Sequence, residues 1–296
     1  MRLIYNIKTR IINSFIGSDF LKKRKKKRKL LKFLCLAITL VSLCVWVFNN
    51  LVLITTEETI TDSEINGEIK IALISDLHVS AFSNTEKILN EVKETEPDII
   101  FVLGDMHSRG QISKISRVTA FLTRLADIAD VYAVTGDHDY SEEYKSAISD
   151  LDNVTLLDYA YSDIDIKGNK LRVYGIDNVY FSDTFDLSNE FETLPSDRIN
   201  ILLSHIPSMQ HYGNFGFDYI FCGDTHGGMV RLPYLGGLYY NGYILPKLTY
   251  NGVITDKGLY EFNETSLYVT SGVGNYPIPL RFNNKPEICL IKLKGE

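Results

Sequence analysis

Five short apolar runs in the second part of the chain set narrow limits on its fold. They cover residues 69–75, 99–103, 131–135, 199–203 and 219–222. Runs of this length predict buried strands, and stretches with helical spacing at 84–96 and 113–128 separate the first three of them. Similar strand-like runs lie at 171–174, 266–270 and 287–293. Strands that alternate with helices indicate an α/β fold, which we expect over residues 69–296.

The residues that follow the five runs are chemically alike. They are Asp76-Leu77-His78, Gly104-Asp105, Gly136-Asp137-His138-Asp139, His205 and Gly223-Asp224-Thr225-His226. Ligands collect at the carboxyl ends of strands in open α/β sheets, and carboxylate and imidazole groups bind divalent metal ions. One histidine at a strand end is more often structural, but five such motifs in register predict a metal site. We interpret His107 and His211, which lie outside the pattern, as surface or loop histidines, with His107 close enough to Asp105 to line the site.

The order of these motifs resembles the calcineurin-like metallophosphoesterase superfamily, whose pattern is D-x-H, G-D, G-N-H-[DE], H and G-H-x-H. The resemblance extends over residues 69–293, and segments 202–207, 227–233 and 271–292 resemble the membrane-anchored YkuE-type branch. It implies a four-layer αββα sandwich. It also implies hydrolysis of a phosphate ester by two divalent ions and a bridging hydroxide.

The resemblance also implies a role for each motif residue. The first ion would be held by Asp76, His78 and His226, both ions by Asp105, and the second ion by Asp137, His205 and Asp224. His138 would be the catalytic histidine that gives a proton or a hydrogen bond to the leaving oxygen. Asp139 would hold the ring of His138 in place. No substrate-binding residue is assigned.

Two departures from the family pattern fall on the second ion. Asp137 stands where the family has asparagine, and Asp224 stands where it has the first histidine of G-H-x-H. With four carboxylates, the site is rich in oxygen and can neutralise both ions, so we predict Mn²⁺ or Fe in preference to Zn²⁺. The added negative charge favours a phosphodiester over a monoester dianion. Ser108 replaces an aspartate of the family and is expected to loosen the support of Asp105.

The same departures leave a second function open. The chain could be a pseudoenzyme that binds a metal or an anion at the membrane without turnover. The retained pair His138–Asp139 favours the enzyme, because a binding protein has no need of a catalytic acid.

The N-terminal part predicts a membrane anchor. Residues 22–29 read KKRKKKRK, and an apolar stretch at 30–54 is long enough to cross a bilayer. The positive-inside rule places the basic residues 1–29 in the cytoplasm and the domain at 69–296 on the other side of the cell membrane. Residues 55–68 are interpreted as a linker or a leading strand. Phe48 is followed by no small-x-small site for signal cleavage, although retention of the anchor stays open.

Charge is divided unevenly along the chain. Residues 1–32 carry twelve Lys or Arg and one acid, a charge of +11, which leaves −17 for the remainder of a chain whose net charge is −6. An acidic body argues against nucleic acid as a partner. The expected partners are the lipid bilayer and a phosphate-ester substrate, which could be linked to a lipid or to the cell wall. Cys222 and Cys289 lie in apolar runs and are interpreted as buried free thiols.

Overall fold

The computed structural model describes residues 2–177, 186–240, 243–244 and 249–296. The chain forms two compact units, Met1–Phe48 and Asn49–Glu296. The first unit is most of helix α1, Arg2–Asn50. Among the described residues, one helical stretch is long and apolar enough to cross a membrane. It lies within Lys23–Asn50, where a window of 18 residues has a mean hydropathy of 2.4.

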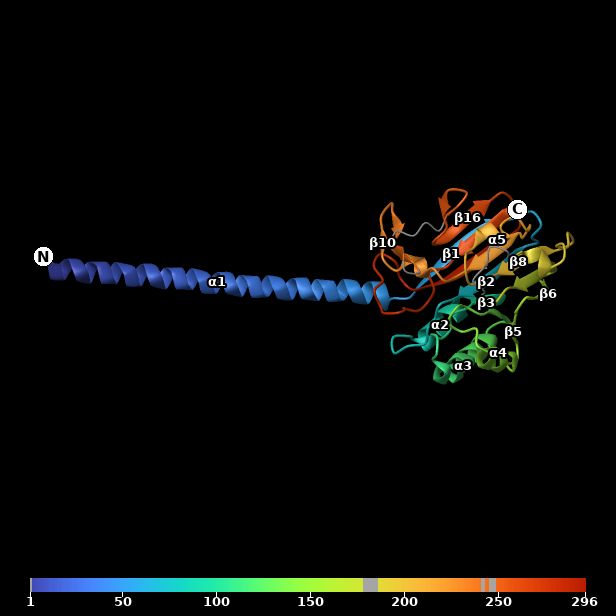
Figure 1. The fold of residues 1–296 in the computed structure, drawn as a ribbon, viewed down its shortest axis with the longest axis horizontal. Coiled ribbons are helices and arrows are strands. Elements are labelled where there is room, and N and C mark those ends of the chain that lie inside the picture. The colour runs from blue at the N-terminus through green and yellow to red at the C-terminus, as the bar shows by residue number, and fades with distance from the viewer. Residues whose placement is uncertain (1, 178–185, 241–242, 245–248) are drawn as a thin grey trace. The chain divides into compact units, whose positions relative to one another are not determined.

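The second unit, called the body here, contains two six-stranded sheets (Figure 1). The first sheet has the order β1-β18-β2-β3-β4-β5. Its strands are β1 (Ile54–Thr61), β18 (Glu287–Lys294), β2 (Glu68–Ile74), β3 (Ile99–Leu103), β4 (Val131–Val134) and β5 (Val154–Leu156). Strands β2 to β5 are parallel, β18 is antiparallel to β2, and β1 is parallel to β18.

The second sheet has the order β16-β17-β9-β8-β7-β6. Its strands are β16 (Gly258–Phe262), β17 (Thr265–Val269), β9 (Tyr219–Cys222), β8 (Ile199–Leu203), β7 (Asn169–Gly175) and β6 (Ala160–Ile166). Its four central strands are parallel, and the two edge strands are antiparallel to their neighbours. Three short hairpins precede β16: β10–β11 (Arg231–Leu232, Gly236–Gly237), β12–β13 (Tyr239–Tyr240, Tyr243–Ile244) and β14–β15 (Thr249–Tyr250, Val253–Ile254).

Helices cover the outer face of the first sheet. They are α2 (Thr85–Thr95), α3 (Ile115–Ala126) and α4 (Glu142–Ser149), with the 3₁₀ turn η1 (Ile112–Lys114) before α3, and they lie together on one side of the body (Figure 1). Asn84 caps α2, since its side chain accepts a hydrogen bond from the backbone N–H of Lys87 at 3.0 Å. The outer face of the second sheet is covered more thinly, by α5 (Met209–Tyr212), η2 (Leu187–Asn189) and loops.

The main core lies between the two sheets. Alternate residues of both sheets meet there, for example Leu73, Phe101, Ile201 and Phe221. Because each sheet is apolar on both faces, its central strands read as continuous hydrophobic runs in the sequence. The predicted α/β sandwich is confirmed, and its fourth layer consists of two short helical turns, α5 and η2, with loops.

Candidate metal centre

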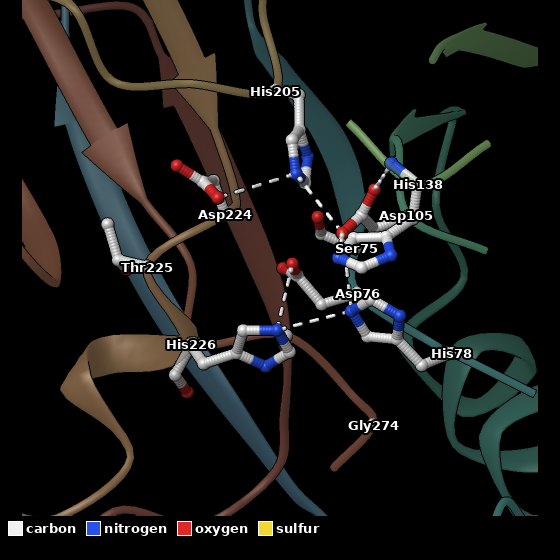
Figure 2. A network of polar contacts seen from close by, with 12 residues as sticks. Ser75, Asp76, His78, Asp105, His138, His205, Asp224, Thr225, His226 and Gly274 are labelled. Carbon is white, nitrogen blue, oxygen red and sulfur yellow. Dashed lines mark hydrogen bonds and ion pairs between the residues drawn. The ribbon is translucent and has the colours of Figure 1, made fainter. Parts of the chain in front are cut away.

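The two sheets bring residues of all five motifs close together (Figure 2). Strands β2, β3 and β4 are parallel neighbours, so Asp76, Asp105 and Asp137 follow adjacent strand ends of the first sheet. Strands β8 and β9 are parallel neighbours in the second sheet and are followed by His205 and Asp224. The site therefore lies where the carboxyl ends of both sheets meet.

A first set of side chains lies around Asp76. The Nε2 atoms of His78 and His226 are 3.3 Å apart, and Nε2 of His226 is 3.5 Å from Oδ1 of Asp76. Asp76, His78 and His226 are buried, and each offers a ligand atom within 4.8 Å of the others. Nε2 of His78 is also 3.2 Å from Oδ2 of Asp105. These are the four residues that the resemblance implies for the first ion.

A second set lies around His205. Its Nε2 atom is 3.5 Å from Oδ2 of Asp105, 3.9 Å from Oδ1 of Asp137 and 3.7 Å from Oδ1 of Asp224. The ligand atoms of Asp137, His205 and Asp224 also lie within 4.8 Å of one another. Asp105 contacts both sets and is the residue placed to join them. All seven candidate ligands are thus brought together.

Hydrogen bonds turn the histidine rings toward the centre. The Nδ1 atom of His205 donates to the carbonyl of Leu103 at 2.7 Å, which leaves the lone pair on Nε2 facing the carboxylates. Ser108 Oγ lies 3.3 Å from Nδ1 of His78 and holds that ring in the same way. Ser108 thus supports His78, and the expected loosening of Asp105 by Ser108 stays a prediction.

The polar atoms at the centre fit divalent metal ions. Among the described residues, both carboxylate oxygens of Asp76 and Nε2 of His205 are buried without a hydrogen-bond partner. Buried polar atoms of this kind call for a ligand, and here they point into a space lined by carboxylates and imidazoles. The seven residues are therefore a suitable donor set for divalent cations. The specific metal does not follow from this geometry.

Burial also keeps two of the imidazoles in their metal-binding form. It lowers the pKa of both His78 and His226, so their rings are neutral at pH 7. Burial, with the nearby charges of Asp105 and Asp224, raises the pKa of Asp76 to about 7. Burial opposes a charge on His205, yet the carboxylates around it, Asp105 first, raise its pKa well above the usual range. A cation bound here would replace that proton.

The backbone of the site is strained. Five of the seven candidate ligands have left-handed φ angles, between 40° and 67°: Asp76, His78, Asp105, Asp224 and His226. Such conformations cost about 1–3 kcal/mol each in non-glycine residues and are typical of functional sites. Gly136 is needed beside them, because a Cβ atom there would lie 2.1 Å from Oδ1 of Asp105.

His138 lies over the second set, but Asp139 does not hold its ring. The backbone N–H of Arg109 donates to Nδ1 of His138 at 3.1 Å, and Nε2 of His138 faces Asp137 at 3.7 Å. The buried carboxylate of Asp139 accepts the backbone N–H groups of Met106 and Gly136, both at 2.6 Å. Our expectation that Asp139 orients His138 is corrected: Asp139 ties together the loops that follow β3 and β4.

Four further residues near the site were given no catalytic or metal-binding role from the sequence. The Arg109 side chain donates to the Asp137 carbonyl at 2.8 Å and is largely exposed above the second set. The Tyr276 ring stacks on His78 with centroids 4.3 Å apart and meets His138 edge-on at 4.6 Å. His107 lies in the loop after β3 and is buried against Tyr144, so the loop alternative for this residue is confirmed and the surface alternative is wrong.

Arg281 is the fourth, and it is only 2% exposed. Its guanidinium donates to the carbonyls of Ser271 and Gly274, each at 2.7 Å, and to that of His226 at 3.4 Å. Burial lowers its pKa to about 10, which leaves it charged at neutral pH. Arg281 therefore fixes the loop after β17 against the ligand His226.

We expect Arg281→Met to lower the free energy of unfolding by about 3 kcal/mol or more, because each buried carbonyl left without a donor costs about 1–3 kcal/mol. Urea unfolding of the full chain in detergent measures this change. The matched control is Arg117→Met, at an exposed position of α3, for which we expect a change within about 0.5 kcal/mol. Equal stability of Arg281→Met and the parent chain would contradict the role given to Arg281.

This fold and this site define the class of protein. The body has two stacked β-sheets with a centre rich in Asp and His at their strand ends. Residues 69–228 match the family model "Calcineurin-like phosphoesterase". The chain belongs to this family, as its motifs indicated. It is thus a hydrolase that acts on phosphate ester bonds and uses divalent metal ions.

Relatives of this chain include bacterial metallophosphoesterases of the YkuE type. The chain is 27% identical to metallophosphoesterase YkuE of Bacillus subtilis over 261 residues, which cover 81% of this chain and 85% of YkuE. It is 25% identical to metallophosphoesterase YkoQ of the same organism, with 75% and 82% covered. It is 28% identical to phosphodiesterase YaeI of Escherichia coli, with 76% and 82% covered.

Proposed function

We propose that the chain is a phosphodiesterase with a two-metal centre, anchored in the cell membrane by α1. The observation that carries the proposal is the pair of ligand sets that share Asp105. Asp76, His78 and His226 would hold one ion, and Asp137, His205 and Asp224 the other. When bound, the two ions supply Lewis acidity to the phosphoryl oxygens and a bridging hydroxide as the nucleophile at neutral pH.

His138 is proposed to act on the leaving group. Because Nδ1 accepts a hydrogen bond from the backbone N–H of Arg109, the neutral ring carries its proton on Nε2. Nε2 faces the centre, 4.0 Å from Oδ2 of Asp105, and is placed to give this proton to the oxygen that departs from phosphorus. In this account Asp139 contributes by positioning the loops.

Charge favours a diester as the substrate. Asp76, Asp105, Asp137 and Asp224 together can neutralise two divalent ions, so little net attraction remains for a dianion. Arg109 adds one exposed positive charge beside the second set and is placed to contact a phosphoryl oxygen. A phosphodiester has a single negative charge and suits this balance. The relative YaeI carries the name phosphodiesterase.

The oxygen-rich second set predicts the metal. We expect kcat/KM of the metal-free protein to be restored about 10-fold better by Mn²⁺ or Fe²⁺ than by Zn²⁺, because carboxylate oxygens favour the harder ions. The matched variant is Asp137→Asn with Asp224→His, which recreates the donors of the family pattern. In this variant the preference for Mn²⁺ or Fe²⁺ over Zn²⁺ should be smaller. Full occupancy and the highest rate with Zn²⁺ alone, in the parent chain, would refute this assignment.

We propose that α1 is retained and crosses the membrane with residues 1–29 in the cytoplasm and the body on the outer side. Support comes from the run of eight basic residues at 22–29 and from the apolar stretch that follows. This orientation is tested by placing a cysteine on the surface of the body and treating intact cells with a membrane-impermeant maleimide, which should label it. Labelling only after the cells are broken open would contradict it.

The test of the activity uses the full chain in detergent, stripped of metal and then supplied with Mn²⁺. Hydrolysis of bis-p-nitrophenyl phosphate should exceed that of p-nitrophenyl phosphate in kcat/KM by about 10-fold, because the dianionic monoester is repelled. Absence of turnover with any divalent ion, in protein that still binds metal, would favour the alternative of a metal-binding pseudoenzyme.

A further inference from the structure

One loop of the body connects the metal centre to the end of the apolar helix. It comprises residues 275–283, after β17, and is called the rim loop here. Tyr276 of this loop stacks on the ligand His78. The preceding residue, Asn275, donates its side-chain amide to the carbonyl of Asn50 at 3.0 Å. Two consecutive residues, with Cα atoms about 3.8 Å apart, thus contact the metal centre and the last residue of α1.

The end of α1 is held firmly by the rim loop. Asn50 Oδ1 accepts the backbone N–H of Arg281 at 2.7 Å, and Asn49 Oδ1 accepts that of Asn283 at 2.8 Å. Asn49 and Asn50 are 8% and 2% exposed and belong to the compact unit of the body. Their polar side chains are therefore satisfied by protein and do not depend on water.

The rim loop must lie near the membrane surface if α1 crosses the bilayer. About 20 residues, at 1.5 Å each, cross a hydrocarbon layer of roughly 30 Å. Counted from Lys32, the last charge before the apolar run, they end close to Leu51. Asn49 and Asn50 are hydrogen-bonded to the rim loop and lie at the end of the membrane-spanning residues. The rim loop therefore stays close to the membrane surface whatever the direction in which α1 leaves the body.

The composition of the rim loop suits that position. Three large apolar side chains on it are about half exposed: Ile278 at 54%, Leu280 at 54% and Phe282 at 47%. The backbone of Phe282 pairs with Arg231 of β10, and the turn after β10 exposes Tyr234 and Leu235. Exposed apolar groups gathered in this way mark an interaction surface.

Six of the nine residues of the rim loop leave no backbone N–H group without a partner. Pro277 and Pro279 have no N–H group. The N–H groups of residues 280–283 are all hydrogen-bonded, to Ile278, Asn50, Met229 and Asn49. In addition, residues 226–255 and 265–286 contain no aspartate or glutamate, although the chain beyond residue 32 carries a charge of −17. No acid of these segments repels an anionic lipid surface.

We propose that the rim loop inserts its apolar side chains into the leaflet from which the body emerges. The metal centre then opens at the level of the lipid headgroups, with Tyr276 between the bilayer and His78, and takes phosphodiesters carried by lipids in that leaflet. The substrate part of this inference rests on the proposed function. In the reaction water adds to phosphorus, one P–O ester bond breaks, and the products are a lipid phosphate monoester and an alcohol.

Bromolipid quenching tests the insertion without reference to activity. The chain has a single tryptophan, Trp46, so Ile278→Trp is made in a Trp46→Phe background and the full chain is reconstituted in vesicles with acyl-brominated lipid. We expect about half of the fluorescence to be lost. The control Tyr161→Trp, on β6 at the other end of the body from β10 (Figure 1), should lose less than about a tenth. Equal, weak quenching at both positions would overturn the proposal.

A second measurement tests the lipid substrate. Ile278→Ser with Leu280→Ser should lower the hydrolysis of hexadecyl 4-nitrophenyl phosphate in vesicles by about 10-fold and leave that of bis-p-nitrophenyl phosphate in solution unchanged. Equal effects on both substrates would refute delivery from the lipid surface. Absence of turnover of either substrate would refute the proposed function, and quenching would still decide whether the rim loop inserts.

Discussion

Asp105→Asn should reduce phosphodiester hydrolysis by roughly 10³–10⁴-fold. Asp105 contacts both ligand sets, with Oδ2 at 3.2 Å from Nε2 of His78 and 3.5 Å from Nε2 of His205. An amide has one oxygen and no charge, so it can neither join two cations nor offset their repulsion. Charge stabilisation by metal ions is worth several kcal/mol, and each 1.36 kcal/mol changes the rate tenfold.

The metal content of the same sample distinguishes the cause of this loss. We expect Asp105→Asn to retain less bound metal than the parent chain and to unfold at a similar urea concentration. The matched control is Asp197→Asn, an exposed aspartate that pairs with its neighbour Arg198, which should keep full activity. Undiminished turnover in Asp105→Asn would show that hydrolysis does not depend on a shared carboxylate.

His138→Gln should lower the rate by about 10²–10⁴-fold when the leaving group needs a proton, the usual range for a positioned acid. The neutral ring carries that proton on Nε2, because Nδ1 accepts the backbone N–H of Arg109. A 4-nitrophenolate leaves readily without protonation, whereas a phenolate gains much from it. The loss should therefore be at least about 10-fold larger for methyl phenyl phosphate than for methyl 4-nitrophenyl phosphate.

The pattern of loss matters more than its size. His138 lies 3.7 Å from Asp137, so its removal could also disturb the metal, but that effect would be the same for both esters. The control His211→Gln, on α5, which covers the outer face of the second sheet, should change neither rate. A loss in His138→Gln that is equal for the two leaving groups would contradict the role of an acid.

The sequence was a good guide to the sheets and to the residues at their ends. Strands β3, β8 and β9 begin and end where their apolar runs do, because these strands are buried on both faces and are almost wholly apolar. Gly104 and Gly136 mark the turns at which β3 and β4 end, so the motifs that follow could be predicted to meet at one edge. Strand β6 was missed because it alternates between half-buried and exposed residues at the sheet edge.

The supporting contacts could not be predicted in the same way. Asp139 follows His138 directly, yet its carboxylate holds the N–H groups of Met106 and Gly136, which depends on how two loops approach in space. Arg281 lies 55 residues after His226 and reaches its carbonyl only through the folded loop after β17. Left-handed backbone at five candidate ligands is likewise imposed by tertiary structure and not by local propensity.

The most direct test of the central claim is to count metal ions and turnover in one titration. Metal-free protein is supplied with increasing Mn²⁺, and bound metal and hydrolysis of bis-p-nitrophenyl phosphate are measured at each step, for the parent chain and for Asp224→Ala. A centre built from two ligand sets that share Asp105 predicts two ions per chain at saturation, activity that appears with the second ion, and a single ion with little activity in Asp224→Ala. Full activity with one ion per chain, unaffected by Asp224→Ala, would contradict a two-metal centre.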